Sequence, residues 1–238
     1  MPNPYFKFKQ FTVFHDQCAM KVGIDGVLLG AWVAVDGCKS ILDVGTGSGL
    51  ISLMIAQRTN NVMIHGIDIA QDAIKQASFN FQSSPWARTL SHQCISFQKF
   101  DMENNQKFDL IVSNPPYFVN SLKNETLEKT IARHTDTLQH KEFLELSIRH
   151  LTTSGSVALI LPLLEGEQCV KDAIQLGLYC KRKVFVHPKI NSQAKRLLLE
   201  FCLEKTICHE QYLTLETNVR HQYTPEFASL VKDFYLKL

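Results

Sequence analysis

The stretch "LDVGTGSGL", Leu42–Leu50, decides the fold that this sequence predicts. An apolar run leads into it, and "GLISLMIAQR" follows it, which is typical of a strand, a tight turn and a helix. Its glycines let the backbone turn sharply and let a ligand approach without a Cβ in the way. The dinucleotide fingerprint G-x-G-x-x-G needs a small residue where Leu50 stands, so that spacing is broken. The stretch therefore predicts a ligand-binding turn of another kind, headed by Asp43.

The spacing that remains, D-x-G-x-G-x-G, is typical of the cofactor turn in S-adenosylmethionine enzymes. The carboxylate at its head can take the ammonium group of such a ligand, directly or through water. A glycine-rich turn that only serves the geometry of the sheet is the structural alternative. We predict that the cofactor-binding residues of this turn are Asp43, Gly45, Thr46, Gly47 and Gly49.

Beyond this turn, apolar strand-like runs alternate with helical patterns along the chain. Such alternation predicts a mostly parallel α/β sheet with helices on both faces. Ligands of these sheets sit beyond the carboxyl ends of the strands, so functional residues should follow the strands. The runs that we interpret as strands are "SILDVG", "VMIHGID", "QCISFQ", "FDLIVS", "SVALILP", "KRKVFVH" and "RLLLEFCLE".

Two further acidic residues follow predicted strands. Asp68 ends "VMIHGID", 19 residues after Gly49, where a carboxylate can accept both hydroxyls of a ribose, and Ile69 adjoins it. A cap on the next helix is the structural alternative for Asp68. Asp101, in "FQKFDMEN", is predicted to accept the adenine amino group, with Met102 near the ring. An acidic residue in an ordinary polar loop is the alternative there.

The stretch "FDLIVSNPPYF" raises the question of chemistry, because a buried strand ends in two prolines. The Asn114 side chain and the Pro115 carbonyl offer two rigid acceptors for an NH₂ group, and Tyr117 offers a flat face for stacking. These acceptors favour a pyramidal nitrogen, and their bonds strengthen as positive charge develops on it. We predict catalytic roles for all three residues, with Asn114 also touching the cofactor.

Composition excludes several other classes of protein. The chain has 238 residues and a net charge of +2, with no apolar run long enough to cross a membrane and no secretory signal at its start. Its seven cysteines are scattered without a C-x-x-C pair, which favours reduced thiols in a cytoplasmic protein over disulfides or zinc. No metal site is predicted.

Positive charge is concentrated in residues 181–200. This concentration is able to bind RNA phosphates, and a solvated loop between two strands is the equal alternative. The candidate residues are Lys181, Arg182, Lys183, Lys189, Lys195 and Arg196.

With these motifs, the sequence resembles class I S-adenosylmethionine-dependent methyltransferases of the group that modifies adenine N6 or glutamine N5. "FTVFHDQCAMKVGIDGVLLGAW" and "ARHTDTLQHKEFLELS" resemble the bacterial valine-tRNA adenine-37 N6-methyltransferase family, and the likeness covers nearly the whole chain. The resemblance implies a Rossmann-like, mostly parallel seven-stranded sheet with an antiparallel C-terminal strand pair. It also implies S-adenosylmethionine as cofactor, a tRNA substrate and no obligate protein partner.

The resemblance also assigns provisional roles to the remaining segments. Residues 1–35, a short hairpin and a helix, are expected to cover the cofactor pocket, and residues 36–238 to form the catalytic domain. Lys21 and Asp25 are placed near the pocket, although Asp25 also suits an N-cap. Arg133 and His134 face either the substrate cleft or solvent at a helix end. Glutamine methylation of a protein such as a release factor, and a non-catalytic RNA-binding module, remain the alternative functions.

Overall fold

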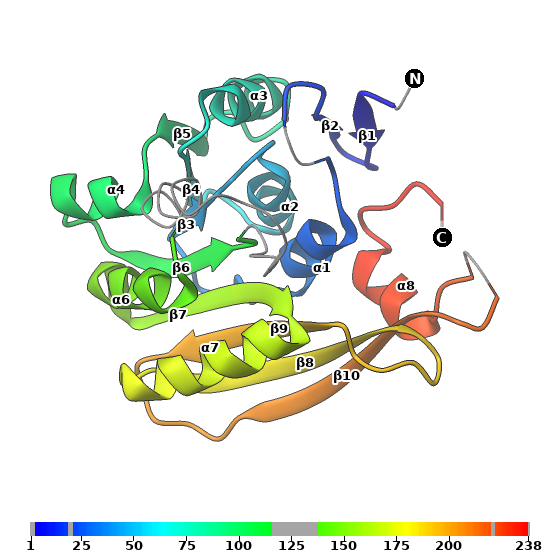
Figure 1. Ribbon diagram of the computed structural model, residues 1–238. Helices are drawn as coiled ribbons and strands as arrows, with labels where there is room; N and C mark the ends of the chain where they lie inside the picture. The colour runs from blue at the N-terminus through cyan, green and yellow to red at the C-terminus, as the bar shows by residue number, and fades with distance from the viewer. Residues whose placement is uncertain (1–2, 19–20, 116–137, 220–221, 238) are drawn as a thin grey trace, which may run out of the picture.

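The computed structural model describes residues 3–18, 21–115, 138–219 and 222–237. They form one eight-stranded sheet with helices on both faces and a separate two-stranded hairpin near the N-terminus (Figure 1). The strand order is β10-β8-β9-β7-β6-β3-β4-β5. The predicted α/β class with a mostly parallel sheet is therefore confirmed.

Every pair of neighbouring strands is parallel except the two pairs that include β9, which runs against β7 and β8. The predicted C-terminal antiparallel pair is thus β8 with β9. The strands are β3 (Ser40–Val44), β4 (Met63–Asp68), β5 (Leu90–Cys94), β6 (Phe108–Ser113), β7 (Leu151–Pro162), β8 (Tyr179–Lys189), β9 (Arg196–Cys202) and β10 (His209–Glu216).

The prediction of seven strands was wrong by one, because β10 extends the sheet along β8. The sequence of β10, "HEQYLTLE", contains no apolar run, and its first four residues are exposed. A strand at the edge of a sheet buries little, so its sequence lacks the apolar pattern by which the other strands were found.

The helices divide into two layers. Helices α1, α2, α3 and α8 share a hydrophobic cluster with one face of the sheet, and α4, α6 and α7 share a cluster with the other face. Neighbouring residues of a strand point to opposite faces, so Ile41 enters the first cluster and Leu42 the second. The helices are α1 (Ile24–Trp32), α2 (Leu50–Arg58), α3 (Gln71–Gln82), α4 (Phe97–Glu103), α6 (His140–His150), α7 (Leu163–Gln175) and α8 (Pro225–Val231).

The segment "QCISFQ" is only partly a strand, which corrects its interpretation as one. Strand β5 ends at Cys94, and the Ser96 side chain accepts a hydrogen bond from the Lys99 N–H as the N-cap of α4. A serine side chain satisfies a helix N-terminus, so the chain turns into a helix where apolar residues alone suggested a continuing strand.

The predicted N-terminal hairpin is present as β1 (Tyr5–Lys7) and β2 (Thr12–Phe14). Val13 belongs to the same hydrophobic cluster as α1 and α2, as do Phe8 and Phe11 between the two strands, and Phe6 packs against it. The Asn80 side chain of α3 exchanges hydrogen bonds with the backbone of Phe14, at 3.0 and 2.8 Å, and donates to the Ser48 carbonyl at 2.8 Å. One hydrophobic cluster contains residues from both sides of residue 35. The division of the chain at that residue stays a prediction.

A buried ion pair joins strands β8 and β9. Glu200 of β9 is 1% exposed, and the Arg182 Nε donates to its Oε2 at 2.6 Å. The Arg182 guanidinium also lies 4.1 Å from the ring centroid of Trp32 in α1, and Lys181 reaches Glu200 from the surface at 3.3 Å.

No described helix has both the length and the apolar character needed to cross a membrane.

Replacing Arg182 with methionine will destabilise the fold by about 3 kcal/mol, because a buried carboxylate then loses its main partner. Lys181→Met is the matched control and will change the free energy of unfolding by about 1 kcal/mol or less, since its side chain is half exposed. Urea denaturation measures both variants. Equal effects would contradict the structural role of Arg182.

Candidate active site

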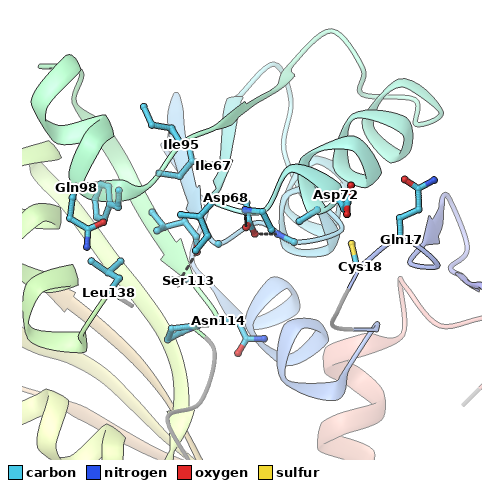
Figure 2. A pocket seen from close by; sticks show the side chains of 18 residues that line it. Gln17, Cys18, Ile67, Asp68, Asp72, Ile95, Gln98, Ser113, Asn114 and Leu138 are labelled. Atoms are coloured by element: carbon cyan, nitrogen blue, oxygen red, sulfur yellow. Dashed lines mark hydrogen bonds between the residues drawn. The ribbon is translucent and has the colours of Figure 1, made fainter. Parts of the chain in front are cut away.

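A cavity of about 430 Å³ opens at the carboxyl ends of β3, β4 and β6 (Figure 2). Its walls come from the turns after these strands, the start of α4 and the segment that follows β2. In Figure 2, Asp68 lies between Gln98 and Leu138 on one side and Gln17 and Cys18 on the other. The cavity's volume lies within the range of about 300–1,000 Å³ that small-molecule sites occupy.

The glycine turn forms the floor of this cavity. Gly45, Gly47 and Gly49 have φ of 73, 56 and 80°, a region that other residues rarely adopt. A Cβ on Gly45 would meet no atom within 4 Å and would occupy open space at the cavity, whereas one on Gly49 would lie 2.4 Å from Phe81. Gly45 and Gly47 therefore leave room for a ligand, and Gly49 allows α3 to pack closely.

Asp43 holds the turn from below. It is fully buried, and its Oδ2 accepts hydrogen bonds from the hydroxyls of Thr46 at 2.8 Å and Ser52 at 2.7 Å. Its Oδ1 is buried with no hydrogen-bond partner within the described residues. Burial raises the pKa of Asp43 from 3.8 to about 6, against the lowering effect of the two hydroxyls. Asp43 is not among the residues that line the cavity, so a contact between its unpartnered oxygen and the ammonium group of a ligand stays a prediction.

The Asp68 carboxylate is oriented by two backbone donors. The Gly47 N–H donates to its Oδ2 at 3.0 Å, and the Ala70 N–H donates to its Oδ1 at 2.9 Å. Each oxygen keeps further lone pairs for the hydroxyls of a ribose. The N-cap of α3 is Ala70, which has no side-chain capping bond, so Asp68 is not the predicted cap and instead accepts from the N–H of the N-cap residue. Its contact with a ribose stays a prediction.

An apolar slot adjoins Asp68, and sequence reasoning missed most of it. Ile69 is 63% exposed and lines the cavity, and its predicted contact with the cofactor stays a prediction. The slot is completed by Ile95, Phe97, Leu138 and the amide of Gln98. The signal that could have indicated these residues is Ser96, whose side chain caps α4 and ends the strand-like run before Phe97.

Asp101 and Met102 are not brought to the cavity. The Asp101 Oδ2 accepts a hydrogen bond from Arg149 at 2.7 Å, and its Oδ1 lies 3.1 Å from the Nε2 of the buried His150. Met102 is 85% exposed on α4. The physical reason is the early end of β5, because the turn reaches the cavity at Phe97 and not four residues later.

Asn114 and Pro115 stand at the end of β6 and line the cavity. Ser113 before them donates its hydroxyl to the Val44 carbonyl at 2.8 Å, which joins this strand end to the glycine turn. The structure therefore brings Asn114 and Pro115 together with the turn and Asp68. The predicted residues Tyr117, Arg133 and His134 lie outside the described residues.

The N-terminal segment reaches the cavity through Gln17 and Cys18. The Gln17 N–H donates to the Gln76 side chain of α3 at 3.1 Å. His15 accepts from the Val22 N–H at 3.3 Å, so its Nε2 donates to the Asn3 carbonyl at 2.9 Å. These bonds fasten both ends of the segment that forms this wall. Lys21 does not line the cavity.

Asp25 is not the N-cap of α1, a position that Gly23 occupies. Instead Asp25 lies in the first helical turn and accepts a hydrogen bond from the Arg196 Nε at 2.9 Å. Its partner is 171 residues away in sequence, so no local pattern indicated it.

The structure separates the predicted basic cluster into residues that form ion pairs and residues that are exposed. Arg182 and Arg196 pair with Glu200 and Asp25, and the Lys183 ammonium lies 2.7 Å from Glu210, with its side chain 12% exposed. Lys181 also contacts Glu200. The exposed members without a described ion pair are Lys189 and Lys195. They flank the β8–β9 turn, at the same edge of the sheet as Asn114, since β6, β7 and β8 run in one direction.

The sheet order, the glycine turn and the acidic residues at the carboxyl ends of β3 and β4 define a Rossmann-like methyltransferase. A family model for the methyltransferase small domain matches residues 25–162. Among solved structures, a predicted O-methyltransferase from Agrobacterium tumefaciens is similar, with a TM-score of 0.69, 17% identity and coverage of 88% of this chain and 96% of that one. NSun6 from Pyrococcus horikoshii with SFG matches with a TM-score of 0.57, 17% identity and coverage of 77% and 53%. At such identities these structures show the fold alone.

Relatives named tRNA1(Val) (adenine(37)-N6)-methyltransferase are much more similar in sequence. Those of Parabacteroides distasonis and Phocaeicola vulgatus are each 46% identical, with 100% of both chains covered. The relative from Trichodesmium erythraeum is 43% identical, with 98% of each chain covered. The chain belongs to the tRNA1(Val) (adenine(37)-N6)-methyltransferase family.

Asp43→Asn will test the buried carboxylate. Between pH 4 and 6 the folded protein binds a proton at Asp43 that the unfolded chain has released, so this group makes stability fall as pH rises. The asparagine Oδ1 still accepts from Thr46 and Ser52 but does not titrate. Relative to the variant, the wild type will lose about 2 kcal/mol of unfolding free energy between pH 4 and 7.

Denaturant unfolding of both proteins across this pH range gives the difference directly. Other carboxylates cancel because both proteins contain them. A difference that stays constant with pH would contradict the raised pKa.

Proposed function

We propose that this chain transfers a methyl group from S-adenosylmethionine to the exocyclic N6 of adenine 37 in a valine tRNA. The observation that carries the proposal is the position of Asn114 and Pro115 beside the glycine turn, in one cavity. Support comes from full-length relatives with that printed name.

S-adenosylmethionine supplies an electrophilic methyl group on its sulfonium when bound. The residues present fit this cofactor. Asp68 has free lone pairs for the ribose hydroxyls, and the buried Oδ1 of Asp43 attracts the ammonium, directly or through water. The apolar slot with Ile69 and Phe97 suits the adenine ring, and the Gln98 amide is suited to bond its polar edge. Gly45 and Gly47 admit the cofactor without a steric clash.

The acceptor site follows from the end of β6. The Asn114 Oδ1 and the Pro115 carbonyl accept hydrogen bonds from the two N6 hydrogens of the target adenine. The N6 lone pair is delocalised into the ring, so these bonds favour the pyramidal, nucleophilic nitrogen and strengthen as charge develops on it. Tyr117, predicted from sequence, stacks on the base. Alignment of nitrogen and methyl supplies the proximity effect.

A base next to the anticodon must leave its stack to enter such a cavity. Lys189 and Lys195 lie at the same edge of the sheet and are proposed to contact tRNA phosphates, with Arg133 as a further candidate from sequence. A tRNA substrate would place the protein in the cytoplasm.

Asn114→Ala will lower the methylation rate by at least about 100-fold, because one of the two transition-state acceptors is lost. Binding of S-adenosylhomocysteine, measured by calorimetry, will change little. Asn60→Ala, at an exposed surface position, is the matched control and will keep full activity. Undiminished turnover of the Asn114 variant would refute its catalytic role.

The destination of a labelled methyl group separates the functions. With total tRNA and total protein as substrates, label in N6-methyladenosine of tRNA supports the proposal, whereas label in protein glutamine indicates the alternative enzyme. Absence of cofactor binding and of label in both pools indicates a non-catalytic RNA-binding module.

Gln98→Met will weaken S-adenosylhomocysteine binding about 5- to 10-fold, since one hydrogen-bonding group of the adenine slot is lost. Asp101→Asn will leave this affinity within about twofold but will lower the melting temperature, because its charge faces Arg149 and His150. Calorimetry and thermal unfolding measure the two effects. If Asp101→Asn weakened S-adenosylhomocysteine binding and Gln98→Met did not, Asp101 would be the residue that contacts the adenine.

A further inference from the structure

Two thiols meet at the outer edge of the sheet, away from the cavity. The Sγ atoms of Cys180 in β8 and Cys208, just before β10, lie 3.3 Å apart. The two residues are 28 positions apart in sequence, so their pairing follows from the addition of β10 to β8, and no cysteine spacing indicated it. Figure 1 shows these two strands side by side.

The pair has the geometry that oxidation requires. A disulfide bond is about 2.0 Å long, so small side-chain rotations close the remaining gap. Both residues are only partly buried, which leaves a path for a small oxidant. Cys202 is also near this corner, but its Sγ contacts the Tyr179 and Glu204 carbonyls.

We propose that Cys180 and Cys208 form a modification site, a dithiol that a hydroperoxide oxidises to an intramolecular disulfide. One thiolate attacks the O–O bond, becomes a sulfenic acid and releases water or an alcohol. The second sulfur then attacks the sulfenic sulfur, whose oxygen leaves as water. Two thiols and one hydroperoxide thus yield the disulfide, one water and one further water or alcohol.

Burial and the neighbouring Cys208 thiol raise the pKa of Cys180, so its sulfur is protonated in the resting pair.

The disulfide would join the edge strand β10 covalently to β8. Strand β10 has one hydrogen-bonded neighbour, β8, and it carries α8, which in turn packs against α1. Edge elements open more readily than central ones, so a covalent tie here limits local unfolding. The site neither includes nor borders the cavity, so the inference does not depend on the proposed function.

The test is peptide mapping of the full-length protein. Reduced protein is treated with hydrogen peroxide, its remaining thiols are alkylated, and it is digested with trypsin without reduction. Cleavage after lysine and arginine separates Cys180, Cys202 and Cys208 into residues 172–181, 197–205 and 206–220. Mass spectrometry should find 172–181 linked to 206–220 within one chain.

Cys208→Ala should abolish this link, and Cys202→Ala, the matched control, should retain it. The oxidised wild type should melt about 5–10 °C above the reduced form, and dithiothreitol should reverse the shift. A link through Cys202, a link between two chains, or overoxidation without any link would overturn the proposal. The wild-type peptide map decides the matter even where a variant folds poorly.

Discussion

The geometry of the site depends on the hydrogen bonds that the buried carboxylate of Asp43 accepts from Thr46 and Ser52. Asp43 sits where β3 ends, and these two bonds hold the turn and the start of α2 in one arrangement. Glycines then carry the chain over it with positive φ, and the Gly47 N–H orients Asp68 at the end of β4. A charge buried at this depth lowers stability at neutral pH. The protein therefore retains an energetically unfavourable group directly beneath the glycine turn.

The same turn is tied to the rest of the molecule. Asn80 connects the Ser48 carbonyl to β2, and Ser113 connects the end of β6 to the Val44 carbonyl. A change in the N-terminal segment would therefore reach the cavity floor through α3, and a change in β6 would reach it through β3. A two-stranded hairpin is unstable alone, and the hydrogen bonds between Asn80 and Phe14 hold this one beside the site.

The sequence predicted the features that local patterns encode. Glycine spacing, strand-end carboxylates and the Asn-Pro pair each lie within a few residues, and the structure gathers them because parallel strands end at one edge. The apolar slot of the cavity was not predicted, because the N-cap at Ser96 ends a strand-like run early and moves the turn. Strand β10 was missed because an edge strand needs no apolar run. The ion pairs of Arg182 and Arg196 join distant segments, and no window of sequence contains both partners.

Those ion pairs also change how the basic segment must be understood. A run rich in lysine and arginine suggests a broad phosphate-binding surface, yet Arg182, Lys183 and Arg196 already neutralise carboxylates of the protein itself. Cations that pair internally release few counterions on binding RNA. Within the part of this basic segment that the structure describes, the exposed lysines without a described ion pair are Lys189 and Lys195, beside the β8–β9 turn. Discrimination among RNAs then has to come from the shape of the folded molecule and from the base that fits the cavity.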